Sequence, residues 1–176
     1  DSIYFGDFVD KTVKKIAYAA SFGADNDLNS ISQFIKKYLN TFDALSVREQ
    51  SGVKILSDNG VSNADIVCDP VFLLDKDCWI NIARKPVENI PEKYILYYAL
   101  RKDEKLIRAA KKVGKDYGIP VLSIHPNGNR SFMIENQLYK IGPKEFVWLI
   151  NNAAYICTNS FHAVAFSSIF KKKVVF

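Results

Sequence analysis

Short apolar runs alternate with amphipathic stretches along most of the chain, and this alternation predicts its secondary structure. Short apolar runs bounded by turn residues are typical of buried strands, whereas apolar residues three or four positions apart indicate a helix. On this basis we predict strands at 15–20, 44–47, 66–68, 94–100, 121–124, around Tyr155 and at 174–176.

Helix signals fill most of the intervals between these strands. Ser46 and Glu49 have the spacing of a capping box, which predicts a helix from near Val47 to Asn59-Gly60. Further helices are predicted over 28–39, from Asp103 as N-cap to Gly118, from Pro143 to Ala153 and from Val164 to Phe170. Strands that alternate with helices favour parallel sheets and the α/β class.

The regular alternation fades between residues 75 and 91, where Pro86 and Pro91 bracket a polar stretch. We therefore predict an N-terminal α/β half over 1–74, a linker over 75–91 and a C-terminal α/β half over 92–176. A second polar stretch, from His125 to Gln137, is predicted to be a loop.

Composition narrows the class of protein. Of 176 residues, 48% are hydrophobic and 24% charged, which indicates a packed core and argues against disorder. The net charge of +5 suits an anionic ligand, but no basic stripe with interleaved aromatics indicates nucleic acid. No segment is long and apolar enough to predict a membrane span. The chain lacks an initiator Met and ends on an apolar strand, as expected of a fragment of a longer protein.

The three cysteines, Cys68, Cys78 and Cys157, show no CxxC spacing. Cys68 and Cys157 lie in or beside apolar runs, so we predict that both are buried thiols in a reducing compartment. The sequence also lacks GxGxxG after a strand, the P-loop pattern, HExxH and GxSxG. A standard dinucleotide site, a metal site and a serine nucleophile elbow are therefore not indicated.

Arg48 is the first candidate for a functional residue. It lies where the strand at 44–47 runs into a predicted helix, and a guanidinium beside helix N–H groups suits phosphate. The alternative is a solvated arginine in the first helical turn. Ser46 and Glu49 are interpreted as caps of that helix.

His162 is the second candidate, in the segment Cys157-Thr158-Asn159-Ser160-Phe161-His162-Ala163. This segment is typical of a strand, a tight turn and a helix start. Such turns line the ligand crevice of open α/β sheets, and an imidazole can exchange protons near neutral pH. The alternative is a ring that merely bonds a neighbouring backbone group. Ser160 and Asn159 are predicted either to cap the last helix or to bind substrate.

Three weaker candidates complete the set. His125 precedes Pro126 in a polar loop and is either exposed or a substrate contact. Ser21 and Gly23 follow the first strand and are predicted to approach a ligand, although Gly23 could simply supply a positive φ. Asp69-Pro70 is interpreted as a turn.

Several of these segments together resemble the polysaccharide pyruvyl transferase family, in order and spacing across nearly the whole chain. The SVRE and TNSFHA segments, in this order, are the most specific. The matching segments are 16–23 (IAYAASFG), 43–49 (DALSVRE), 69–74 (DPVFLL), 94–98 (YILYY) and 158–163 (TNSFHA).

The resemblance implies a GT-B-like fold, with two Rossmann-like halves facing across a cleft. It also implies a cytoplasmic enzyme that transfers pyruvyl from phosphoenolpyruvate to a pair of sugar hydroxyls, forming a ketal. The acceptor would be a cell-surface polysaccharide or a lipid-linked precursor, with no metal or other cofactor required. The family's functional Arg and His correspond to Arg48, which would hold the trianionic donor, and His162, which would protonate its methylene carbon.

Two departures from the family pattern stand at the ends of the chain. The family has a Gly-rich start with a Ser-Asp-Gln-type motif, and a C-terminal tail that packs back after the final strand, and this sequence has neither. Two rival functions share the same features. One is a GT-B glycosyltransferase that uses a nucleotide sugar, and the other is a non-catalytic glycan-binding domain.

Overall fold

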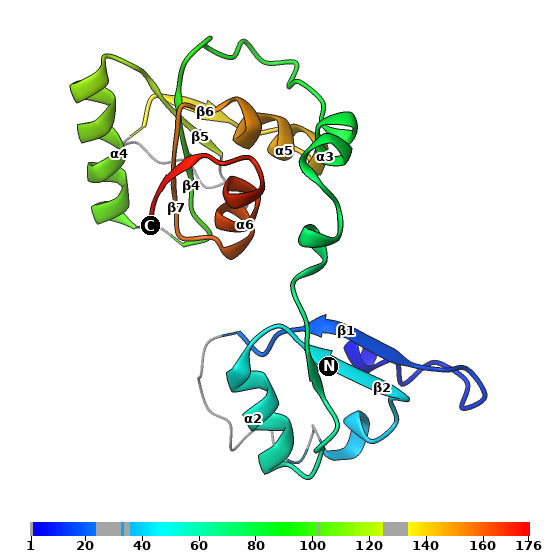
Figure 1. The fold of residues 1–176 in the computed structure, drawn as a ribbon. Helices are drawn as coiled ribbons and strands as arrows, with labels where there is room; N and C mark the ends of the chain where they lie inside the picture. Colours follow the sequence, from blue (N-terminus) through cyan, green and yellow to red (C-terminus); the bar gives the residue numbers. More distant parts are fainter. Residues whose placement is uncertain (1, 24–32, 34–35, 102, 125–133) are drawn as a thin grey trace. The chain divides into compact units, whose positions relative to one another are not determined.

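A computed structural model describes residues 2–23, 33, 36–101, 103–124 and 134–176 (Figure 1). The chain forms two compact units, Asp1–Pro70 and Val71–Phe176, here called the first and the second unit. Each contains a parallel sheet with helices, so the predicted α/β class is confirmed. The helix predicted over 28–39 lies mostly outside the described residues.

The first unit is built on a three-stranded parallel sheet in the order β1-β2-β3. A 3-10 turn, η1 (Ser2–Phe5), precedes β1 (Ile16–Ala20), and β2 (Ala44–Val47) has the predicted bounds. Helix α2 (Gln50–Asp58) connects β2 to the short edge strand β3 (Asp65–Ile66). The apolar core of this unit contains Leu39, Leu45, Val47, Ile55, Leu56 and Val61.

The predicted capping box of α2 is wrong. Ser46 belongs to strand β2, and its hydroxyl accepts from the Ala19 N–H at 3.0 Å and donates to the Ala17 carbonyl at 3.2 Å. Glu49 is the N-cap residue, but its side chain does not cap the helix. The spacing was right for a box, but hydrogen bonding to β1 extends the strand to Val47, and α2 then begins at Gln50. Gly60 does close α2 with a φ of +85°, as predicted.

The second unit contains a five-stranded parallel sheet in the order β6-β5-β4-β7-β8. Its strands are β4 (Ile95–Tyr98), β5 (Val121–Ile124), β6 (Asn136–Leu138), β7 (Tyr155–Thr158) and β8 (Lys173–Val175). The chain first builds outward from β4 to β5 and β6, and then crosses to the other side of β4 to add β7 and β8. This is the strand order of a doubly wound Rossmann sheet, with its switch point between β4 and β7.

Helices cover both faces of this sheet (Figure 1). Helix α4 (Glu104–Tyr117) lies on one face, packing Leu106, Ile107 and Ala110 against Ile95 and Tyr97. On the other face lie α5 (Pro143–Asn152) and α6 (Phe161–Ile169). The predicted helix signals hold here: Asp103 accepts from the Leu106 N–H at 3.0 Å, Gly118 ends α4 with a φ of +66°, and Pro143 opens α5.

The segment predicted as a linker, 75–91, differs from that prediction in part. It contains helix α3 (Lys76–Ile82), capped by Asp75, which accepts from the Cys78 N–H at 2.8 Å. Trp79 of this helix packs edge-on against Phe166 of α6 at 4.9 Å between ring centroids, and its Nε1–H donates to the Val71 carbonyl. The division between units falls between Pro70 and Val71, inside the 3-10 turn η2 (Pro70–Leu73). A helix this short shows too little periodicity to be recognised from sequence.

Two other predictions are corrected by the edges of the sheets. The last residues of the loop predicted over 125–137 belong to β6, an edge strand in which only Leu138 is buried. Because its other residues are polar, the sequence pattern does not indicate a strand there. Cys68, predicted to be buried, is exposed because β3 ends at Ile66 and Cys68 lies beyond it. Cys157, in strand β7, is buried as predicted.

The three cysteines therefore differ in accessibility, and we expect this to show in chemical modification. Burial raises the pKa of the Cys157 thiol to about 11, which keeps it protonated and unreactive. A disulfide reagent at pH 8 should modify Cys68 and Cys78 in the native protein and Cys157 only after unfolding. The Cys68→Ser/Cys78→Ser protein is the control and should show no native-state modification. A third thiol that reacts at its unfolded rate would contradict the buried position.

Gly114 is where α4 comes closest to the chain that follows it. A Cβ at this position would lie 2.9 Å from the Ile119 carbonyl oxygen and 3.3 Å from Val121 Cγ2. Because a backbone oxygen cannot rotate aside, Gly114→Ala should cost about 1–3 kcal/mol of stability. Replacing a glycine inside a helix normally stabilises it by about 0.5–1 kcal/mol. The steric clash at Gly114 should exceed this gain, so the variant should be less stable than the wild type.

Urea unfolding followed by circular dichroism measures this cost. Lys111→Ala, on the exposed side of the same helix, is the matched control and should unfold close to wild type. Equal stabilities for the two variants would show that α4 is not packed this closely.

Candidate functional site

In the first unit, the predicted residues gather at the carboxyl ends of the strands. Ser21 and Gly23 follow β1, and Arg48 and Glu49 follow β2. Asp69 lies three residues beyond β3. In parallel sheets these ends share one edge, which is where ligands bind in α/β folds.

Arg48 is held by a carboxylate that the sequence did not indicate as a site residue. Its Nη1 bonds the carboxylate of Asp69, whose side chain is only 2% exposed, while that of Arg48 is 25% exposed. The Arg48 backbone N–H donates to the Ala20 carbonyl at 3.1 Å. Arg48 thus lies just before the N-cap of α2, as expected, but it is an ion-pair partner and not a solvated arginine.

Glu49 is a second carboxylate beside this arginine. Its Oε2 lies 3.9 Å from Arg48 Nε, and its Oε1 accepts from the Phe22 N–H at 2.9 Å. Glu49 therefore ties the turn after β1 to the start of α2. One guanidinium and two carboxylates meet at this edge, so the cluster formed by Arg48, Glu49 and Asp69 is acidic overall.

The last residues of β1 and the turn that follows it have an unusual backbone. Ala19 has a φ of +53°, and the register with β2 shifts between Ala17 and Ala20. Positive φ is costly for a residue with a Cβ and is found most often at functional sites. Gly23, exposed, has a φ of +73°, and its N–H donates to Ser21 Oγ at 3.1 Å. Gly23 thus supplies the positive φ that the sequence analysis considered.

In the second unit, the predicted residues lie at the switch point, where β4 and β7 end. Asn159 follows β7, and its side chain accepts from the Leu100 N–H at 2.9 Å and donates to the Arg101 carbonyl at 3.2 Å. Its amide therefore joins the turn after β7 to the turn after β4. The Ser160 N–H donates to Thr158 Oγ1 at 3.0 Å, which shapes the same turn from within.

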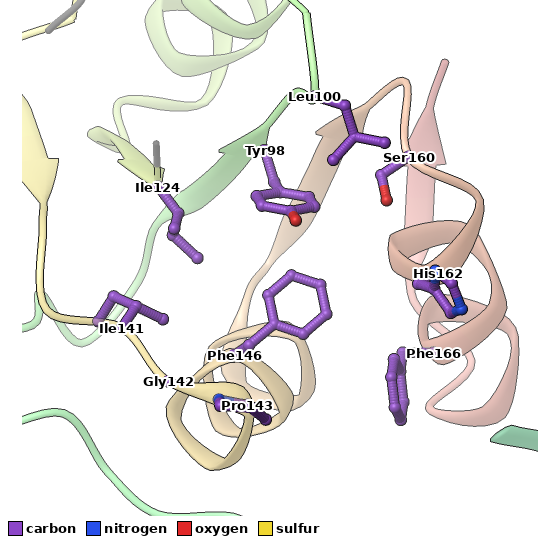
Figure 2. A pocket seen from close by; sticks show the side chains of 10 residues that line it. All are labelled: Tyr98, Leu100, Ile124, Ile141, Gly142, Pro143, Phe146, Ser160, His162 and Phe166. Carbon is purple, nitrogen blue, oxygen red and sulfur yellow. The ribbon is translucent and has the colours of Figure 1, made fainter. Parts of the chain in front are cut away.

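A hollow of about 380 Å³ opens at this switch point. Figure 2 shows the rings of Tyr98 and Phe146 next to each other, with Ser160 at the start of α6 and His162 on that helix. Among the described residues the lining is mainly apolar, and it includes no Lys, Arg, Asp or Glu there. The hollow is lined by Tyr98, Leu100, Ile124, Ile141, Gly142, Pro143, Phe146, Ser160, His162 and Phe166.

Tyr98 supplies a polar group inside this apolar lining. It ends β4, and its ring lies 4.8 Å from that of Phe146 between centroids. Burial raises the pKa of its hydroxyl, so at neutral pH the group is protonated and can donate a hydrogen bond. The sequence pattern predicts Tyr98 only as part of the buried strand at 94–100.

His162 is exposed and lies in the first turn of α6, where its ring meets that of Phe161 edge-on at 5.4 Å. Ser160 is the N-cap residue, as predicted, although its hydroxyl makes no capping bond and the residue is buried. Both residues line the hollow. His125 lies outside the described residues.

The structure thus brings Ser21, Gly23 and Arg48 to one edge in the first unit, and Asn159, Ser160 and His162 to the switch point of the second. Among the described residues, no group of three His, Cys, Asp or Glu could hold a metal ion. The helices of the described part of the chain include none long and apolar enough to cross a membrane.

A family model described as polysaccharide pyruvyl transferase matches residues 2–176. The chain belongs to this family. The match covers both units, including SVRE at the end of β2 and TNSFHA at the end of β7, so the resemblance noted from sequence is confirmed. As a polysaccharide pyruvyl transferase, the protein is a transferase enzyme that acts on a polysaccharide acceptor. A comparison with curated proteins gave no match.

Ser46 gives a stability test of the edge that carries Arg48 in this pyruvyl transferase. Its hydroxyl bridges Ala17 and Ala19 of β1, where the register with β2 shifts between Ala17 and Ala20 and forms a bulge. Ser46→Ala removes the hydroxyl that bonds the buried Ala19 N–H and the partly buried Ala17 carbonyl. We expect the free energy of unfolding to fall by about 1–3 kcal/mol. Urea unfolding measures the change, with exposed Ser62→Ala as control. If both variants matched wild type, the bridge would not hold the bulge.

Proposed function

We propose that this protein transfers the pyruvyl group of phosphoenolpyruvate to two hydroxyls of a sugar in a cell-surface polysaccharide or its lipid-linked precursor. The product is a pyruvyl ketal, and inorganic phosphate leaves. The observation that carries the proposal is the place of Arg48 and His162 in the fold. Each belongs to a segment that matches the family and lies at the carboxyl edge of a parallel sheet.

Arg48 is assigned to the phosphate or carboxylate of the donor. A guanidinium presents several N–H donors in a planar fork that matches these anions. Because Asp69 and Glu49 stand beside it, the edge does not attract anions by net charge. Donor binding here must depend on directed hydrogen bonds from Arg48 and on the N–H groups of the adjoining turns.

His162 is assigned to proton delivery. It protonates the methylene carbon of phosphoenolpyruvate, so that a C–H bond forms, the C=C bond breaks and positive charge develops at the central carbon. One sugar hydroxyl attacks that carbon and releases its proton, and the C–O bond to phosphate breaks. The second hydroxyl then attacks, releases its proton and closes the ketal. A positioned acid of this kind contributes typically about 10²–10⁴-fold.

Replacing Arg48 tests the donor site. We expect Arg48→Ala to weaken phosphoenolpyruvate binding by on the order of 2 kcal/mol, because a charge-assisted contact is lost. Titration calorimetry measures the affinity, and Arg108→Ala, on the exposed face of α4, is the matched control. Unchanged affinity in a folded Arg48→Ala protein would refute the assignment.

Replacing His162 tests the proton donor. His162→Gln should lower turnover by about 10²–10⁴-fold and leave donor affinity nearly unchanged, since the imidazole acts in the chemical step. The helix should persist because the N-cap residue is Ser160. Exposed Ser168→Ala, later in α6, is the control. A folded His162→Gln enzyme that turned over at the wild-type rate would make the ring structural.

The reaction itself is tested with the full-length protein, phosphoenolpyruvate and candidate saccharide acceptors, following phosphate release. Acceptor-dependent phosphate release supports the proposal. Binding of UDP or GDP with no response to phosphoenolpyruvate would identify a nucleotide-sugar glycosyltransferase instead. Saccharide binding with no phosphate release from any donor would identify a glycan-binding domain.

A further inference from the structure

The side chain of Asp69 is almost completely buried and contacts Arg48. Its side chain is 2% exposed, and Arg48 Nη1 donates to its Oδ2. A carboxylate removed from water is costly unless a donor compensates it. Arg48 is therefore a group that holds Asp69 in place, and Asp69 in turn helps to orient the guanidinium.

The backbone fixes Asp69 from both sides. Before it, the Val67 N–H donates to the Val47 carbonyl at 3.0 Å, which continues the pairing of β3 with β2. After it, Pro70 restricts the backbone of the preceding residue and opens η2. Asp69 is thus a rigid anchor, whereas Arg48 is a long side chain that would otherwise sample many rotamers.

Glu49 does not play the same part. Its side chain is 27% exposed, its Oε2 is 3.9 Å from Arg48 Nε, and its other oxygen bonds Phe22. Of the two carboxylates, Asp69 makes the closer contact with the guanidinium and is the more deeply buried.

We propose that Asp69 is a positioning residue that holds the Arg48 guanidinium in the orientation that binds the anionic donor. This inference rests on the proposed function of Arg48. Arg48 then loses its side-chain conformational entropy when the protein folds, and this loss does not weaken donor binding.

Removing the Asp69 carboxylate should change the affinity for phosphoenolpyruvate in opposite directions, depending on whether Asp69 acts through its charge or by positioning Arg48. Asp69→Asn removes a negative charge next to the donor site, so an effect of charge alone would strengthen the binding of phosphoenolpyruvate. Loss of positioning would weaken it. The sign of the change in affinity therefore distinguishes the two effects.

The experiment uses the full-length protein and compares Asp69→Asn with Asp65→Asn, an exposed aspartate in β3. We expect the dissociation constant for phosphoenolpyruvate, from titration calorimetry, to rise about 10-fold or more in Asp69→Asn. It should be unchanged in Asp65→Asn. In an Arg48→Lys background, Asp69→Asn should have much less effect, because residues that act together are not additive.

A second readout follows Arg48 without any ligand. The Nε–Hε resonance of Arg48 in a proton–nitrogen NMR spectrum should be distinct in the wild type and in Asp65→Asn. It should broaden or be lost in Asp69→Asn. If Asp69→Asn does not fold, Asp69→Glu takes its place, since it keeps the charge and displaces the carboxylate. Affinity that is unchanged in Asp69→Glu would then overturn the proposal.

Each outcome decides one of the two proposals. Equal or tighter binding in Asp69→Asn, with only thermal stability lowered, would overturn the positioning role and leave the proposed function standing. A wild-type protein that binds no phosphoenolpyruvate would overturn the proposed function. The Arg48 resonance then decides the positioning role: loss in Asp69→Asn alone supports it, and retention overturns it.

Discussion

The second unit depends on burying both faces of its central strand, β4. Ile95 and Leu96 are both fully buried, the first among residues of the cluster beneath α4 and the second in the cluster beneath α5 and α6. A strand covered in this way needs helices on both sides, and the chain supplies them by crossing from one side of β4 to the other. The segments that follow β4 and β7 line the hollow with Tyr98 and His162, together with the start of α5.

The two candidate sites differ in chemistry because their sheets end differently. In the first unit, a guanidinium and two carboxylates meet at the end of a short three-stranded sheet, and their mutual pairing makes the edge polar and ordered. In the second unit, mainly aromatic and aliphatic side chains line the hollow, and the polar side chains among its described lining residues are those of Tyr98, Ser160 and His162. Under the proposed function, the first environment suits directed contacts to an anion, and the second suits proton transfer from His162.

The sequence predicted an element correctly where the signal, such as a helix cap or a short apolar run, depends only on residues close together in the chain. Strands β2 and β5 have the predicted bounds, and Asp103, Gly118 and Pro143 mark helix ends as expected. Prediction failed where distant pairing overrode local preference. Ser46 and Glu49 have capping-box spacing, but β1 draws Ser46 into a strand and Phe22 binds Glu49 instead. Helix α3 and strand β6 were missed because contacts within the second unit stabilise them, and their own sequences show little periodicity.

By itself the sequence determined the α/β class, the family resemblance, and the place of Arg48 and His162 at strand ends, because these depend on residue order and local periodicity. Only the tertiary structure decided what surrounds them. Asp69 is 21 residues from Arg48 in sequence, and Tyr98 is far from Phe146, so their contacts required the parallel register of β2 with β3 and the packing of α5 on β4. A sequence pattern carries no information on such contacts, since the partners become neighbours only when the sheets form.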